Sequence, residues 1–302
     1  MGVYADLYRY RELFGSLFRR DLRAKYKGSV LGLAWSLANP VLLMLVYLLV
    51  FSVLLKVSGA ANLPHYWLFL LCGLPAWVFF ATSLQASSRS LIENANLIRK
   101  VRFPRQLVPL ANVATQLVSF VVMLVIVIGL SLVYVPAARS TVVLAIPLAA
   151  LVVCLVAGLA LAVASANAIF RDVEHIVAAL LLPWFFLTPV VYSLDRIPGA
   201  TTHPWFARLI HWGNPLTPAI EALRAPLYFG HAPRAADTIY LVVSAVAALA
   251  LGAFVLRGST TGSRSKSDDG PAVEEPVGAG VGRQPLVVAR LEPVEKRRKQ
   301  ER

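Results

Sequence analysis

The sequence predicts an all-helical integral membrane protein, and three observations lead to that prediction. First, hydrophobic residues make up 58% of the 302 residues and charged residues only 15%, with a mean hydropathy of +0.66, whereas about a quarter of an ordinary soluble domain is charged. Second, six long apolar stretches carry no Lys, Arg, Asp or Glu. Third, the 29 basic residues gather in alternate segments between those stretches. These features exclude a typical soluble globular protein, a disordered chain and a coiled coil.

Each apolar stretch has about the 20 residues that cross roughly 30 Å of hydrocarbon. The first stretch lies too far from the N-terminus, and lacks a small-residue cleavage site, to be a removable signal peptide. We therefore expect it to stay as a span. The six predicted spans cover residues 30–55, 66–88, 107–135, 142–170, 176–194 and 238–256.

The basic residues predict how the spans are oriented. Alternate connecting segments hold 23 Lys and Arg on one side and six on the other. Because basic loops stay in the cytoplasm, we expect a multi-pass protein of the cytoplasmic membrane with both termini inside. The net charge of +13 is then a matter of topology, and no nucleic-acid partner is expected.

Three segments outside the spans are expected on the inner side. Residues 1–29 contain an amphipathic pattern at helical spacing over 4–25, which predicts a helix lying on the inner leaflet. Residues 90–105 form a polar and basic insert of helical character, stopped by Pro104. Residues 257–302 are rich in Gly, Pro, Ser and charge, so we expect a flexible cytoplasmic tail.

The remaining long connection, residues 195–237, is expected on the outer side. It is rich in Pro, Trp and His. Apolar residues recur within 205–212 and 219–228, and this rhythm predicts two short helices that dip back into the membrane.

The chain lacks the motifs of an energy-coupling site. It contains no Gly-Lys dipeptide, so it has no phosphate-binding loop of the Gly-Lys-Ser/Thr kind, and any ATP must be handled by a partner. The spans lack the ionisable groups with which ion-coupled carriers bind a driving ion. We expect no cofactor in this chain and no proton or sodium coupling. Cys72 and Cys154 match neither a disulfide framework nor a zinc site.

A membrane enzyme is an alternative from another class. General acid–base catalysis needs two titratable groups held close together, and the spacing of the candidates matches no metal-ligand pattern. The same residues can serve as helix caps, ion pairs or interfacial groups, so we predict no catalytic residue and no metal site. The candidates are Glu93, Asp172 and Glu174 on the inner side, and Asp195, Glu221, Asp237, His65, His203, His211 and His231 on the outer side.

Aromatic residues recur at helical spacing in three of the predicted spans. Aromatic faces can stack on sugar rings and give a polymer a surface on which to slide. The alternative is lipid-facing packing and interfacial belts, where Trp and Tyr are common. The residues are Tyr47 and Phe51 in the first span, Tyr66, Phe69, Gly73, Trp77 and Phe80 along one stripe of the second, and Phe185 and Tyr192 in the fifth.

The insert at 90–105 also has two interpretations. A short basic connection can be a topology signal and nothing more. However, Asn94, Leu97, Ile98 and Val101 would form an apolar ridge on a helix that no bilayer covers. Such a ridge favours docking to another protein.

Several motifs, taken in order, resemble one known family. After the amphipathic basic helix come the span opening GSVLGLAWSLANPVLLMLVYLLVFSVLLK, the insert NANLIRKVRFP, the segment ANAIFRDVEHI, then PWFFLTPVVY and NPLTPAIEALR. This order resembles the ABC-2 type permease subunits that export O-antigen, capsular polysaccharide and teichoic acid. The likeness covers about residues 7–256, and the charged tail after Arg257 is longer than the minimal family pattern.

The resemblance implies a homodimer of six-span subunits paired with two copies of a separate nucleotide-binding subunit, which would bind ATP and magnesium. It also implies that the insert is a coupling helix in a cleft of that ATPase, and that residues 170–175 are a second contact. The ATPase-coupling residues would be Glu93, Asn94, Leu97, Ile98, Arg99, Lys100, Arg102, Phe103, Arg171 and Asp172.

The resemblance further implies a path for a lipid-linked glycan past the first and fifth spans. Arg20, Arg23, Lys25 and Lys27 lie at headgroup depth, where their charge can favour the pyrophosphate of a polyprenol carrier or serve only topology and anionic membrane lipids. The substrate-channel residues would be Tyr47, Phe51, Trp77, Phe80, Phe185 and Tyr192, and the outer gate would contain Trp205, Trp212, Asn214, Pro215 and Glu221.

We therefore expect the permease subunit of an ABC exporter that moves a lipid-linked polysaccharide outward, of the O-antigen, teichoic acid or cell-wall galactan type. Two alternatives stay open. One is an exporter of a small lipid or drug, and the other is a membrane glycosyltransferase or acyltransferase.

Overall fold

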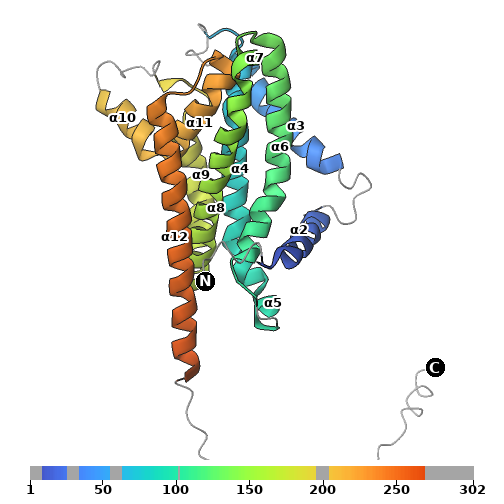
Figure 1. Ribbon diagram of the computed structural model, residues 1–302, viewed down its shortest axis with the longest axis vertical. Helices are drawn as coiled ribbons and strands as arrows, with labels where there is room; N and C mark the ends of the chain where they lie inside the picture. Colours follow the sequence, from blue (N-terminus) through green and yellow to red (C-terminus); the bar gives the residue numbers. More distant parts are fainter. Residues whose placement is uncertain (1–8, 26–33, 55–62, 101–102, 195–203, 269–302) are drawn as a thin grey trace, which may run out of the picture. The chain divides into compact units, whose positions relative to one another are not determined.

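Figure 1 shows the computed structural model of the chain, which describes residues 9–25, 34–54, 63–100, 103–194 and 204–268. Within those ranges every regular element is a helix and there is no strand, so the predicted all-helical fold is confirmed. The chain divides into two units, residues 1–264 and 265–302. The second unit is described only as far as residue 268.

Helix α4, Tyr66–Glu93, is the centre of the first unit. It packs against α6, Leu107–Tyr134, and against α8, Ala145–Ile169 (Figure 1). Phe79 of α4 stacks on Phe120 of α6, with 4.8 Å between the ring centroids. A helix that is apolar all round belongs either in a protein core or in a membrane. Most of α4 is buried, so it forms the core around which the other helices pack.

Four helices are long and apolar enough to cross a membrane: Tyr66–Glu93, Leu107–Tyr134, Ala138–Ile169 and Ala235–Gly258. They correspond to the second, third, fourth and sixth predicted spans. The last of them is the first part of α12, Ala235–Asp268.

The fourth span begins earlier than the sequence predicts. A short helix α7, Ala138–Thr141, and a 3-10 turn η3, Val142–Leu144, lead directly into α8. Every residue at these junctions keeps a right-handed helical backbone, so the three elements form one continuous rod. The predicted start at residue 142 is therefore wrong by one turn of helix.

The first and fifth predicted spans are shorter helices. Helix α3, Ala34–Leu48, continues into a π-helical stretch η1, Leu49–Leu54, and residues 30–33 and 55 lie outside the described part. Helix α9 is Val173–Leu187. The prediction of one helix through residue 194 is therefore wrong.

Thr188 ends α9 for a local reason. It precedes Pro189, and a proline ring disfavours the helical conformation of the residue before it; Thr188 accordingly has φ −97° and ψ 129°. The 15 residues of α9 rise only about 22 Å, less than the hydrocarbon thickness of about 30 Å. The chain then makes a buried turn over residues 188–191. Non-helical backbone is tolerated at membrane depth only where protein satisfies its polar groups, so this turn needs internal partners.

Two short helices follow between α9 and α12, where the sequence predicts them. Helix α10 is Pro204–Gly213, and α11, Leu216–Arg224, continues as a π-helical turn η5, Ala225–Phe229. Gly230 ends η5 with φ 70°, and a Cβ at this position would lie 2.4 Å from the Cβ of Ala137. Only glycine fits both the backbone and the space.

The inner segments differ from the prediction in their limits. The amphipathic helix is described as α2, Arg11–Lys25, and residues 1–8 lie outside the described part. The predicted single helix over 90–105 is wrong, because α4 runs on to Glu93 and a separate short helix α5, Ala95–Lys100, follows after Asn94. The segment expected as a tail from 257 begins as helix, since α12 continues to Asp268.

Candidate functional site

Aromatic rings from three separate parts of the chain line one groove beside α4. Tyr47 of α3, Phe51 of η1, Trp77 of α4 and Phe185 of α9 all face it. The groove has a volume of about 480 Å³. Its other lining residues are Val46, Val50, Ala81, Gln85, Ala178, Leu181, Leu182 and Phe186.

Phe185 is the centre of this aromatic cluster. Its ring centroid lies 5.5 Å from that of Tyr47 and 5.4 Å from that of Trp77. Phe51 lies 6.2 Å from Phe185 and stacks on Tyr47 at 5.8 Å. These separations are typical of favourable aromatic pairs. Four of the six predicted substrate-channel residues therefore meet in space, although they come from three distant parts of the sequence.

The other two predicted channel residues do not line the groove. Phe80 is fully buried between Trp77 and Trp184, with centroid distances of 5.6 and 5.0 Å. The Tyr192 hydroxyl donates a hydrogen bond of 3.0 Å to the carbonyl oxygen of Phe186.

The stripe predicted along the second span is mostly core. Tyr66 and Phe69 are buried like Phe80, and their rings stack at 6.2 Å. Phe69 also meets Tyr228 edge-on at 5.4 Å. Lipid-facing packing, the alternative weighed for this stripe, is therefore wrong for these three residues.

Arg224, at the end of α11, holds the buried turn that follows α9. Its side chain is fully buried. The guanidinium donates to the carbonyl oxygens of Phe69 at 3.3 Å, Pro189 at 2.5 Å and Val190 at 2.5 Å. It also pairs with Glu221 at 3.0 Å and lies 3.8 Å from the centroid of the Phe69 ring.

Asn214, like Arg224, bonds to residues at the end of α9. Its amide donates to the Thr188 hydroxyl at 2.8 Å, and its carbonyl oxygen accepts from the indole nitrogen of Trp184 at 3.0 Å and from the backbone of Leu216 at 3.1 Å. From α4, the Tyr66 hydroxyl donates to the carbonyl oxygen of Val191 at 2.6 Å. The buried polar groups of the turn thus find partners within the protein.

The C-terminal end of α4 carries a second small core. Leu17 of α2 and Leu91 of α4 are buried there with Leu107, Val108, Ala111 and Ala164. Leu97, Ile98 and Phe103 are half-buried against this cluster. The predicted exposed apolar ridge is wrong in this respect, because Leu97 and Ile98 are half-buried against this cluster of the chain's own residues. The exposed side chains nearby are Ile92, Glu93 and Asn96.

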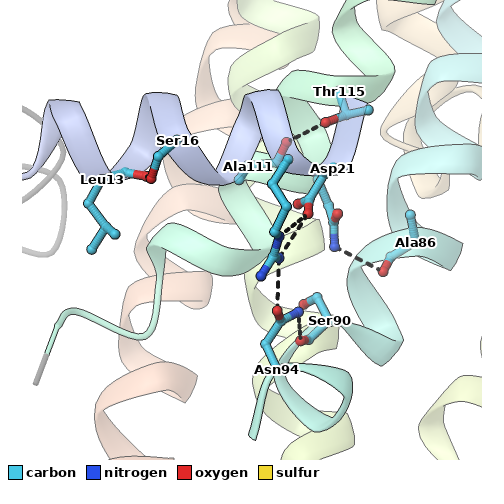
Figure 2. Close-up of polar contacts among 10 residues, drawn as sticks. Leu13, Ser16, Asp21, Ala86, Ser90, Asn94, Ala111 and Thr115 are labelled. Carbon is cyan, nitrogen blue, oxygen red and sulfur yellow. Dashed lines mark hydrogen bonds and ion pairs between the residues drawn. The ribbon is translucent and has the colours of Figure 1, made fainter. Parts of the chain in front are cut away.

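Two of the predicted basic residues hold α2 in place. Arg20 donates 2.8 Å bonds to Asp21 and to the side chain of Asn94 (Figure 2). The Lys25 ammonium donates to Gln116 of α6 at 3.1 Å, and desolvation lowers its pKa. Arg23 is exposed and lines an open pocket together with Ser16, Arg19, Arg20 and Ala24. Lys27, Val101 and Arg102 lie outside the described residues, and so do the side chains of Arg99 and Lys100.

A polar joint connects the start of α9 to α4 and α8. The Asn167 amide donates to the carbonyl oxygen of Ser88 at 2.8 Å, and its own oxygen accepts from the backbone of Glu174 at 3.0 Å. Arg89 pairs with Glu174 at 2.7 Å. The side chains of Arg171 and Asp172, just before this joint, are exposed.

Residues 12–228 match the family of ABC-2 type transporters. This match covers most of the chain. The chain belongs to the ABC-2 type transporter family. Together with its apolar helices, this makes it a multi-pass membrane protein and a transporter permease rather than an enzyme.

Curated relatives include two O-antigen export system permease proteins named RfbA. The protein from Myxococcus xanthus is 34% identical over 244 residues, which are 81% of this chain and 91% of the relative. The protein from Klebsiella pneumoniae is 32% identical over 207 residues, or 67% of this chain and 78% of the relative.

In this ABC-2 chain most of the described titratable candidates for catalysis are engaged in structural contacts, whereas Glu93 and Asp172 are exposed. His211 pairs with Asp237 at 2.7 Å, Glu221 with Arg224 at 3.0 Å, and Glu174 with Arg89 at 2.7 Å. Asp172 precedes α9 as its N-cap residue without a side-chain hydrogen bond, and His65 and His231 contact aromatic rings. The described part of the chain contains no group of three His, Cys, Asp or Glu that could hold a metal. Asp195 and His203 lie outside it.

The remaining predicted gate residues have different surroundings. Trp205 and Trp212 are exposed, and the Trp212 ring lies 5.3 Å from Tyr240 of α12. Pro215 is the N-cap residue of α11. Asn214 and Glu221 are tied into the contacts with Thr188, Trp184 and Arg224 described above.

Sequence reasoning missed two residues of the ABC-2 fold described here. Arg224 stands at the end of the motif NPLTPAIEALR, and a basic residue in a mostly apolar segment was a signal that it is buried with a partner. Gln85 also belongs to this set, because it follows Trp77 and Ala81 at successive i+4 steps along one broad stripe of α4.

Proposed function

We propose that this chain is the permease subunit of an ABC exporter that moves a lipid-linked polysaccharide across the cytoplasmic membrane. The observation that carries the proposal is the groove in which Tyr47, Phe51, Trp77 and Phe185 converge. Aromatic faces offer contact area without fixed polar partners, which suits a polymer that must slide. The names of the relatives support O-antigen as the kind of glycan.

In this proposal the chain crosses the membrane six times, with both termini in the cytoplasm. Four crossings are the long apolar helices, and α3 with η1 and α9 with its buried turn complete the set. Helix α2 lies on the inner leaflet, where its exposed basic residues meet anionic lipid. Helices α10 and α11 return into the outer leaflet and close the exit of the groove.

The transporter would be a homodimer with two copies of a separate ATP-binding subunit. That subunit binds ATP and magnesium and supplies the energy. The contact would consist of α5 with the end of α4, and the corner at 170–175. Because Leu97 and Ile98 pack inward, exposed Glu93 and Asn96, with Arg171 and Asp172, are the side chains available to the partner.

The pocket on α2 is proposed to receive the pyrophosphate of the carrier lipid. Arg19, Arg20 and Arg23 line it, and guanidinium groups pair well with phosphate oxygens. Arg20 is already bonded to Asp21 and Asn94. Arg19 and Arg23 are therefore the more available of the three.

Reconstitution tests this proposal directly. The chain is assembled with its ATP-binding partner in proteoliposomes that contain polyprenol-linked O-antigen from Myxococcus xanthus. Exporter function predicts ATP-dependent transfer of the glycan to the face opposite the ATPase, measured with a membrane-impermeant glycosidase. The chain alone should hydrolyse no ATP. Transfer without ATP, or export of small lipids that is unaffected by Tyr47→Ala, would contradict the proposal.

A charge reversal tests the contact with the ATPase. Glu93→Lys places a cation on an exposed position beside α5, so we expect the stimulated ATPase rate to fall by about tenfold, the effect of about 1.4 kcal/mol at an interface. Glu12→Lys, on exposed α2, is the matched control and should behave as the wild type. Equal rates in the two variants would remove the end of α4 from the proposed contact.

A further inference from the structure

Three polar side chains line the aromatic groove: the Tyr47 hydroxyl, the Trp77 indole nitrogen and the Gln85 amide. Within the residues that the structure describes, none of the three makes a hydrogen bond through its side chain. Nearby groups of the same kinds behave differently. The hydroxyls of Tyr66, Tyr192, Tyr228 and Tyr240 donate to backbone carbonyls at 2.5–3.0 Å, and the Trp184 indole donates to Asn214.

Gln85 is the most accessible of the three. Its side chain is exposed and lies along α4 from Trp77 through Ala81, all three of which line the groove. Eight residues of helix span about 12 Å. The groove therefore presents aromatic faces over that length of α4 and an amide at the end toward the cytoplasmic side of the proposed topology.

An unpartnered amide is costly among apolar side chains inside a membrane span. A lipid acyl chain would leave the amide without a partner. A sugar ring satisfies both sides of the groove, because its hydroxyls can donate to the amide oxygen and accept from the amide and indole N–H groups. Its C–H face can at the same time lie on an aromatic ring.

We propose that Gln85, with Trp77 and Tyr47, forms hydrogen bonds to hydroxyl groups of the glycan and thereby sets which sugars the groove accepts. This inference rests on the proposed function and deepens it. Aromatic stacking accepts any ring, whereas a site that hydrogen-bonds a hydroxyl rejects an analogue that lacks it. The occupant is thus a pyranose segment of the polysaccharide rather than the lipid part of the carrier.

The test separates binding from turnover. Gln85→Met keeps the length of the side chain and removes the amide. In the reconstituted complex, we expect the apparent KM for polyprenol-linked O-antigen in stimulating the ATPase to rise about fivefold, as for the loss of one neutral hydrogen bond. The maximal rate should be unchanged, because a contact kept throughout transport affects binding alone. Gln85→Asn keeps an amide on a shorter side chain, so its apparent KM should lie between those of the wild type and Gln85→Met.

Thr82→Val is the matched control. It removes a polar group from the same helix, but Thr82 lies outside the groove and bonds to the carbonyl oxygen of Val78. We expect wild-type KM and maximal rate. A wild-type KM in Gln85→Met, or a fall in maximal rate alone, would overturn the role of Gln85 and leave the proposed function standing. If Gln85→Met lost the dimer without a change in KM, the amide would contact a second copy of the chain, and this result would also overturn the proposed role of Gln85. A wild-type complex without any glycan-dependent ATPase would overturn the proposed function and this inference together.

Discussion

Trp184 and Phe185 are neighbours on α9, yet they belong to two regions with opposite chemistry. The Trp184 indole is bonded to Asn214, in a region where Asn214 also bonds to Thr188, and where Arg224 and Tyr66 donate to backbone carbonyl groups. We call this region, Tyr66, Trp184, Thr188, Asn214 and Arg224, the collar. Phe185 instead faces the groove, where the Gln85 amide and the Trp77 indole N–H make no hydrogen bond to any described residue.

The difference separates the fixed part of α9 from the part that can receive a ligand. Buried polar groups are retained in proteins when they are bonded, and a fully bonded network makes its surroundings rigid. The collar fits that description, and it closes a helix that is too short to cross the membrane. The polar groups of the groove instead make no hydrogen bond to the described residues. This arrangement fits a site where a ligand supplies the missing partners.

Removing the centre of the collar should have the largest effect. Arg224→Leu leaves the carbonyl groups of Phe69, Pro189 and Val190 without their donor and Glu221 without its partner. Loss of one member of a buried ion pair costs about 3–5 kcal/mol. We expect the protein to be scarce in membranes and to unfold at a much lower temperature in detergent.

Arg208→Leu supplies the comparison for that variant. Arg208 is an exposed arginine on α10, so its replacement should leave abundance and thermal unfolding unchanged. If the two variants had the same stability, the collar would not be what holds the turn after α9.

Gly73→Ala tests the collar without removing any of its polar groups. A Cβ at Gly73 would lie 2.6 Å from Nη2 of Arg224 and 3.2 Å from Ile220. A long side chain can often move aside, but Arg224 is tied by its hydrogen bonds, so we expect a loss of about 1–3 kcal/mol. Gly129→Ala, in α6, has nothing within 4 Å of the added Cβ and should gain up to about 1 kcal/mol from helix propensity. Thermal unfolding of both variants shows whether each substitution lowers or raises stability. Equal changes in the unfolding temperature would contradict the prediction.

The sequence predicts well which segments are helical, and it predicts less well where each helix ends. Hydropathy alone finds the four long spans, because about 20 apolar residues without charge leave few other structures. The fifth span was extended through 194 because Pro189 and Val190 are apolar. Hydropathy does not register that the proline breaks the helix at Thr188, or that Arg224, 35 residues beyond Pro189, donates to the carbonyl groups of the buried turn.

The candidate site was predictable only in part, for a related reason. Helical spacing predicts that Tyr47 and Phe51 share one face of a helix. It does not predict which helices pack together. The meeting of α3, α4 and α9 depends on tertiary contacts, which placed Phe80 in the core and Gln85 in the groove. At the C-terminal end of α4, Leu97 and Ile98 resemble a docking ridge in sequence, because spacing along one helix does not show that they pack against a cluster that includes Leu17 of α2 and Ala164 of α8.

The smallest expected effect comes from making one substitution in both regions. Trp184→Phe removes an indole that donates to Asn214 at 3.0 Å, and the loss of one neutral hydrogen bond should lower the free energy of unfolding by about 1 kcal/mol. Trp77→Phe keeps an aromatic ring beside Phe185 and removes an indole N–H that makes no hydrogen bond within the described residues, so only lost packing should lower its stability. We expect the loss of stability to be smaller than in Trp184→Phe, and to be accompanied by weaker stimulation of the ATPase by low concentrations of glycan. If Trp77→Phe destabilised the protein as much as Trp184→Phe, the groove would be ordinary core, and the contrast between the two ends of α9 would not hold.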